Sequence, residues 1–122
     1  MNPISYFEIP VHDMERAVGF YQAVFGYEFE RVSLDGNAMA LFPYADGRSG
    51  ASGALAKGDS YHAGKSGARI YFSVANIKAT LAKAVAAGGA VLYTETEVGT
   101  FGSVAEIEDL EGNCIGLHAV NR

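Results

Sequence analysis

The chain has 122 residues, of which 49% are hydrophobic and 19% are charged, as is typical of one globular domain. Its net charge is −5 and its nine lysines and arginines are scattered, which argues against a nucleic-acid partner, because phosphate binding needs clustered basic side chains. We find no apolar run of roughly 18 residues and no signal peptide, and the single Cys114 excludes an intrachain disulfide, so we expect a cytoplasmic protein without a membrane partner.

Residues 4–26 predict a strand, a sharp turn and one amphipathic helix. β-branched and aromatic side chains up to Val11 favour the strand, and Pro10 is expected near its end. Asp13 is a good helix cap, and Gly26 favours a left-handed stop. Between them, apolar side chains recur at helical spacing, at Met14, Ala17, Val18, Tyr21 and Phe25.

The rest of the chain predicts seven more strands and one more helix. Turn signals lie at residues 35–37 and 111–113, and glycines are dense in residues 44–67. The helix is expected at 77–87, ended by the glycines at 88 and 89. The strands are expected at 27–33, 38–43, about 51–57, from 69 onward, 91–95, 104–108 and 114–120.

The plan of residues 6–29 returns in residues 69–92. Asn76 takes the place of Asp13 as the capping residue, and the glycine stop recurs as well. We therefore interpret the chain as one domain, 1–122, made of two βαβββ repeats at about 1–62 and 63–122, an α+β fold. One helix per repeat covers one sheet face, so the other face must meet a ligand, another unit or another chain.

Period-two alternation predicts which side chains occupy each face. The helix side should receive Phe7, Ile9 and Val11 from the first repeat, and Ile70, Phe72, Val74, Ile115 and Leu117 from the second. The opposite side should carry Tyr6, Glu8, Arg69, Tyr71, Ser73, Cys114, Gly116 and His118. That second face is polar for a sheet interior, which is typical of a ligand-binding hollow.

The paired repeats, the helix opening DMERAVGFYQAVFG and the closing segment EDLEGNCIGLHAV resemble the vicinal oxygen chelate superfamily. This is the group of glyoxalases, bleomycin-resistance proteins and extradiol dioxygenases. The resemblance implies a cupped, mixed eight-stranded sheet with the helices outside and a ligand cavity inside. It also implies that a homodimer is common.

The superfamily's enzymes usually bind a divalent metal at four matched strand positions. The resemblance places Tyr6, Arg69, Gly116 and, with looser alignment, Ala54 at these positions. Arg cannot ligate a metal, Gly and Ala offer no side-chain donor, and Tyr is a poor ligand at neutral pH. We therefore expect no metal at the usual site and no cofactor.

The face opposite the helices suggests a charge pair in place of the metal. Because the resemblance sets the two first strands side by side, Glu8 should pair with Arg69 or with a ligand. The candidate ligand-binding residues are Tyr6, Glu8, Arg69, Tyr71, Ser73 and His118. The leading function is binding a small organic, possibly anionic, molecule, as in metal-free bleomycin-resistance-type proteins.

Two alternatives stay open. The protein could be a glyoxalase-like lyase or isomerase with Glu8 as a catalytic base. It could also use a displaced metal site made of Glu8, Glu106 and His118.

Two other readings are rejected. Cys114 is expected to be a small buried residue rather than a nucleophile. Residues 58–66, GDSYHAGKS, lack the spacing and the following helix of a phosphate-binding loop.

Overall fold

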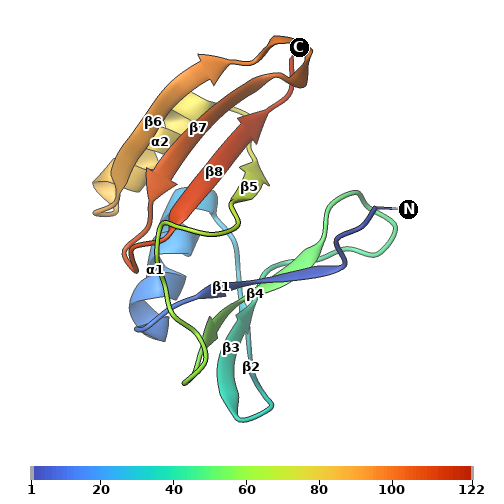
Figure 1. Ribbon diagram of the computed structural model, residues 1–122, viewed down its shortest axis with the longest axis vertical. Coiled ribbons are helices and arrows are strands. Elements are labelled where there is room, and N and C mark those ends of the chain that lie inside the picture. Colours follow the sequence, from blue (N-terminus) through green and yellow to red (C-terminus); the bar gives the residue numbers. More distant parts are fainter. Residues whose placement is uncertain (1, 122) are drawn as a thin grey trace.

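The computed structural model describes residues 2–121 and contains two βαβββ units, which confirms the predicted α+β fold class (Figure 1). The first unit consists of β1 (Tyr6–Pro10), α1 (Met14–Phe25), β2 (Glu30–Leu34), β3 (Asn37–Leu41) and β4 (Ser52–Lys57). The second consists of β5 (Ile70–Ser73), α2 (Ile77–Ala86), β6 (Ala90–Glu97), the short 3₁₀ helix η1 (Gly99–Phe101), β7 (Ser103–Glu108) and β8 (Cys114–Ala119).

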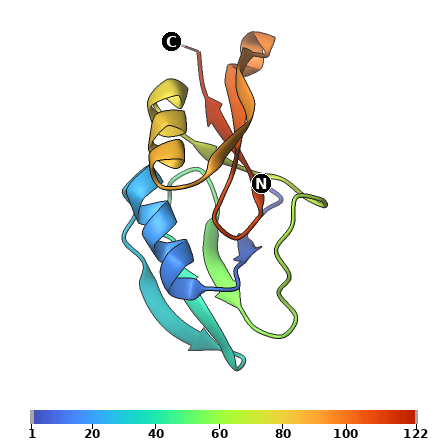
Figure 2. The same ribbon diagram turned by 90° about the vertical axis from the view of Figure 1, so that its left-hand side faces the viewer.

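The eight strands form two mixed sheets of four, in the orders β1-β4-β3-β2 and β5-β8-β7-β6. In each sheet the first two strands are parallel and the others are antiparallel. Helix α1 packs on β3 and β4, helix α2 packs on β6, β7 and β8, and the helices contact each other. Figure 2 shows the helices one above the other on the same side of the molecule.

The helix ends follow from local chemistry. The Asp13 carboxylate accepts the Arg16 backbone N–H at 3.1 Å, and Gly26 adopts the predicted left-handed conformation with φ of 75°. Asn76 caps α2 in the same way, but the left-handed residue after α2 is Gly88 rather than the next glycine. Glycine is required at the next position, 89, because a Cβ there would lie 2.6 Å from a backbone carbonyl.

Aromatic rings from both units share one core. The predicted helix-side residues Phe7, Ile9 and Val11 join this core, as do their counterparts in the second unit. The Phe72 ring lies 6.1 Å from that of Phe7 and 5.4 Å from that of Phe42, so β5 contacts the core of the first unit directly. In residues 2–121 we find no helix long and apolar enough to cross a membrane.

One predicted strand begins later than expected. Residues 27–29 were predicted as part of a strand, but β2 starts at Glu30. Tyr27 instead stacks on Phe25, with ring centroids 5.2 Å apart, and Phe29 packs against Phe42 at 4.9 Å. The aromatic residues that favoured a strand thus pack into the core after the end of α1 instead.

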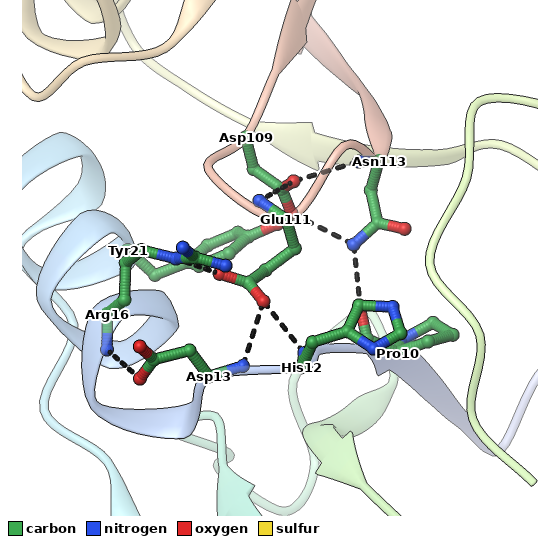
Figure 3. A network of polar contacts seen from close by, with 8 residues as sticks. All are labelled: Pro10, His12, Asp13, Arg16, Tyr21, Asp109, Glu111 and Asn113. Atoms are coloured by element: carbon green, nitrogen blue, oxygen red, sulfur yellow. Dashed lines mark hydrogen bonds and ion pairs between the residues drawn. The ribbon is translucent and has the colours of Figure 1, made fainter.

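A carboxylate of the second unit binds the start of α1 (Figure 3). Oε1 of Glu111 accepts the backbone N–H groups of His12 and Asp13 at 2.7 and 3.0 Å, and Oε2 accepts Arg16 Nε at 2.7 Å. The Glu111 side chain is fully shielded from solvent. Burial favours a higher pKa for Glu111, but the bonds from Arg16 and the two backbone amides outweigh it and lower the pKa.

Buried polar groups extend this connection into the core (Figure 3). Oδ2 of Asp109 accepts the Tyr21 hydroxyl at 2.8 Å and the Asn113 amide at 3.0 Å. The same Asn113 nitrogen donates to the Pro10 carbonyl at 2.8 Å, at the end of β1. The turn between β7 and β8, which contains Glu111, therefore fixes β1 and α1 of the first unit against the second unit. We call this network of hydrogen bonds the interunit clasp.

Candidate functional site

The sheet registers show where the strand positions lie at which the resemblance implies a metal. Glu8 lies opposite Ala54 on neighbouring strands, and Tyr71 lies opposite Gly116 in the same manner in the second sheet. Ala54 is therefore the structural counterpart of Gly116, as the looser sequence alignment suggested. Neither residue offers a side-chain donor atom.

The three residues of the predicted displaced metal site are not brought together. Glu8 is bonded to tyrosines, Glu106 is bonded to Arg69, and His118 Nε2 lies within hydrogen-bonding distance of the Phe101 carbonyl. Within residues 2–121 no group of three or more His, Cys, Asp or Glu side chains has an arrangement that could bind a metal ion.

The predicted ion pair between Glu8 and Arg69 is not formed. Arg69 Nη1 donates to Glu106 Oε2 at 2.7 Å, on the sheet to which β5 belongs. The Glu8 carboxylate instead accepts the hydroxyls of Tyr61 at 2.7 Å and Tyr6 at 2.9 Å. β1 and β5 belong to separate sheets, and each charged side chain finds partners near its own sheet.

The outward face of the second sheet carries a thiol beside this ion pair. Cys114 Sγ donates to Glu106 Oε1 at 3.7 Å, while Arg69 donates to the other oxygen of Glu106. Burial raises the pKa of Cys114, and the nearby carboxylate adds to the rise, although Arg69 opposes it. A half-buried, protonated thiol fits the expectation that Cys114 is not a nucleophile.

An aromatic ring lies over the position where the superfamily usually has a glutamate. A Cβ on Gly116 would lie only 2.4 Å from the ring of Tyr71. A side chain at position 116 would therefore push against the Tyr71 ring, which rests directly on the strand. Tyr71 remains 44% exposed, so the other side of its ring is accessible.

A cavity of about 450 Å³ opens between the two units; we call it the interunit cavity. Its lining includes four partly or fully buried aromatic rings, from Phe7, Tyr27, Phe42 and Phe72. Three exposed polar residues on or just before β5 also line it, namely Arg69, Tyr71 and Ser73. β1 and β5 are edge strands of their sheets, which leaves the aromatic core accessible here.

The six predicted site residues therefore lie at different places. Arg69, Tyr71 and Ser73 gather at the interunit cavity, whereas Glu8 lines a second cavity of about 440 Å³ and Tyr6 lines a third. His118 lies apart, with its ring 4.5 Å from that of Phe101. The sequence reading missed the four aromatic residues of the interunit cavity, because alternation assigns Phe7 and Phe72 to the core and cannot show that the core is open there.

Comparisons with known proteins agree with this architecture. A family model described as bleomycin resistance protein-like N-terminal matches residues 4–42. A glyoxylase-like domain-containing protein from Didymella fabae is 31% identical over 121 residues, covering 96% of this chain and 91% of that protein.

Solved structures show the same fold. A glyoxylase/bleomycin resistance protein/dioxygenase domain from Frankia sp. EAN1pec has a TM-score of 0.76 at 17% identity, covering 99% of both chains. TnmS3, an antibiotic binding protein from Streptomyces sp. CB03234, has a TM-score of 0.70 at 20% identity, covering 99% of this chain and 98% of its own. The fosfomycin resistance protein FosX from Listeria monocytogenes has a TM-score of 0.70 at 18% identity, covering 100% and 94%. The chain therefore belongs to the vicinal oxygen chelate superfamily of glyoxalases, bleomycin-resistance proteins and dioxygenases.

Proposed function

We propose that this protein binds a small organic molecule in the interunit cavity without using a metal ion. The observation that carries the proposal is the lining of this cavity, which combines four aromatic residues with three polar residues. Its volume of about 450 Å³ lies within the range of roughly 300–1,000 Å³ that is usual for small-molecule sites. The rings would bury the apolar part of the ligand, and the polar side chains would orient it.

The donor atoms at the superfamily's metal positions support binding without a metal. Tyr6 would have to lose its proton to become a good ligand, but burial and the bond to Glu8 raise its pKa to about 12. The guanidinium of Arg69 stays protonated, and Ala54 and Gly116 contribute only backbone atoms.

The polar side of the cavity favours a ligand with an anionic or carbonyl group. Arg69 Nη1 donates to Glu106, and the permanent positive charge of the guanidinium at this cavity favours an anionic group. An aromatic acid therefore matches both kinds of lining residue. Binding of a drug-like molecule is in keeping with relatives named as an antibiotic binding protein and as a fosfomycin resistance protein.

We further propose that the protein is cytoplasmic, has no nucleic-acid partner and forms a homodimer. The edge strand β6 exposes Val91, Leu92 and Tyr93, and an uncovered edge strand with apolar side chains favours pairing with a second copy. Native mass spectrometry should give the dimer mass at micromolar concentration. A monomer alone at these concentrations would contradict the dimer.

The binding proposal can be tested with 8-anilinonaphthalene-1-sulfonate, an aromatic anion that fluoresces in apolar sites. Ala51→Phe should narrow the cavity and weaken binding at least tenfold, because Ala51 belongs to its lining. Arg69→Gln should weaken binding roughly tenfold, since a charge-assisted hydrogen bond contributes about 1.5–3 kcal/mol.

Two control variants should leave probe binding unchanged. Ala63→Phe places the same ring in the second cavity, and Arg31→Gln removes an arginine that pairs with Glu15 away from the cavity. Thermal melts of all variants would establish that each one is folded. Probe binding to Ala51→Phe as tight as to the wild type, or binding that EDTA abolishes, would overturn the proposal.

A further inference from the structure

Glu8 is a hydrogen-bonded carboxylate that has no cationic partner within residues 2–121. In the part of the chain that the structure describes, four ion pairs are present, and their carboxylates are Glu15, Glu106, Glu108 and Glu111. The Glu8 carboxylate accepts only hydroxyl groups within residues 2–121. These hydroxyls orient the carboxylate but carry no positive charge, so no protein cation within residues 2–121 neutralises it.

The two tyrosines around Glu8 reach it from different segments. Tyr6 is two residues earlier on β1, whereas Tyr61 lies in the loop that leads from β4 to β5. Tyr61 packs against the apolar cluster of Met39, Ala54 and Ala56 on the outward face of the first sheet. The carboxylate is therefore fixed between an aromatic side chain of the strand and one of the loop.

Glu8 also faces the second cavity, of about 440 Å³, and is the only carboxylate of its lining. Two other polar groups there already have partners within the protein. The Asn113 carbonyl oxygen accepts the Gly64 backbone N–H at 3.1 Å, and the Cys114 thiol donates to Glu106. Among the described residues, Glu8 is therefore the one carboxylate that lines this cavity, beside the imidazole of His62.

We propose that the second cavity binds the ammonium group of a small organic amine, with Glu8 as its counter-ion. An ammonium N–H can donate to lone pairs of the Glu8 oxygens that the two tyrosines leave unused, since each carboxylate oxygen accepts more than one bond. A single carboxylate provides too few ligands for a divalent metal, which separates this site from a metal centre.

This amine site is distinct from the interunit cavity. Of the lining residues, Ile70 alone contributes to both, and Arg69 belongs only to the interunit cavity. The interunit cavity therefore favours an anionic ligand and the second cavity a cationic one. The two proposals are independent, so the failure of one does not affect the other.

The test uses benzylamine and its neutral analogue benzyl alcohol, titrated into the wild-type protein near neutral pH and followed by calorimetry and by NMR shifts. Benzylamine should bind and benzyl alcohol should bind at least tenfold more weakly, because only the amine can pair with Glu8. Glu8→Gln should weaken benzylamine binding roughly tenfold or more. The control variant Glu95→Gln removes a negative charge from an exposed position on β6 and should leave benzylamine binding unchanged.

Further variants separate the charge from the tyrosine bonds. Tyr61→Phe removes one donor but keeps the carboxylate, so benzylamine binding should persist. Glu8→Gln should leave 8-anilinonaphthalene-1-sulfonate binding intact, because that probe tests the interunit cavity. The inference is overturned if the wild type binds benzylamine and benzyl alcohol equally well. It is also overturned if Glu8→Gln binds benzylamine as tightly as Glu95→Gln does. The comparison of the two ligands needs only the wild type, so it remains decisive even if Glu8→Gln does not fold.

Discussion

The interunit clasp predicts that one shielded carboxylate stabilises the whole fold. In Glu111→Gln the amide keeps the shape of the side chain but loses its charge. Its NH₂ group must then face either Arg16 or the amides of His12 and Asp13, donor against donor. Each backbone bond at the helix start contributes about 1 kcal/mol, as capping bonds do.

The ion pair with Arg16 adds less, because the Arg16 side chain is 47% exposed and such pairs contribute below about 1 kcal/mol. We therefore expect Glu111→Gln to lower the free energy of unfolding by about 2 kcal/mol. For a domain of this size that corresponds to a fall in Tm of roughly 6–12 °C. Urea unfolding and thermal melts near pH 7 measure both, with Glu95→Gln on the exposed face of β6 as the matched control.

The pH dependence gives a second readout of the same variant. The pKa of Glu111 is lowered in the folded protein from its ordinary value of 4.5. The carboxylate therefore contributes its full stabilisation above pH 4.5 and loses it as the pH falls through the lower, folded pKa. The gap between the wild type and Glu111→Gln should shrink in acid, whereas equal stability of Glu111→Gln and Glu95→Gln near pH 7, or a gap independent of pH, would refute the reasoning.

Two further predictions concern buried contacts. Tyr21→Phe leaves a buried oxygen of Asp109 without its hydroxyl donor and should cost about 1–3 kcal/mol, whereas Tyr93→Phe on the surface should cost little; equal losses in urea unfolding would contradict this. Gly116→Ala should cost about 1–3 kcal/mol by pushing against the ring of Tyr71, and a background of Tyr71→Ala should remove most of that cost. Additive losses in the double variant would show that the ring does not lie where the structure places it.

The fold was predictable because its signals are local and occur twice. Each helix start is marked by one capping residue, Asp13 for α1 and Asn76 for α2. The alternation of side chains also assigned the helix-facing residues of the strands correctly. Both glycines after α2 were predicted as its stop, but their separate roles were not: Gly88 adopts the left-handed conformation, whereas glycine is required at position 89 by a close approach to β7 that no local pattern shows.

The candidate site was less predictable, because its partners come from distant segments. Several carboxylates were candidate partners of Arg69 in the sequence. Arg69 bonds to Glu106 rather than Glu8 because β1 and β5 belong to separate sheets, which the sequence does not show. The loop after β4 showed only dense glycines in the sequence, yet its Tyr61 donates to Glu8. Glu111 read as one residue of a tight turn, and its bonds to the start of α1 leave no spacing pattern in the sequence.

The central claim is that a member of this superfamily binds an organic ligand without a metal, in the cavity lined by aromatic rings between its units. Native mass spectrometry of EDTA-treated protein with 8-anilinonaphthalene-1-sulfonate tests it most directly. We expect one probe molecule per chain with no added metal mass, and little or no adduct with Ala51→Phe. An adduct that forms only after a divalent metal is restored, or one that Ala51→Phe retains in full, would contradict the account.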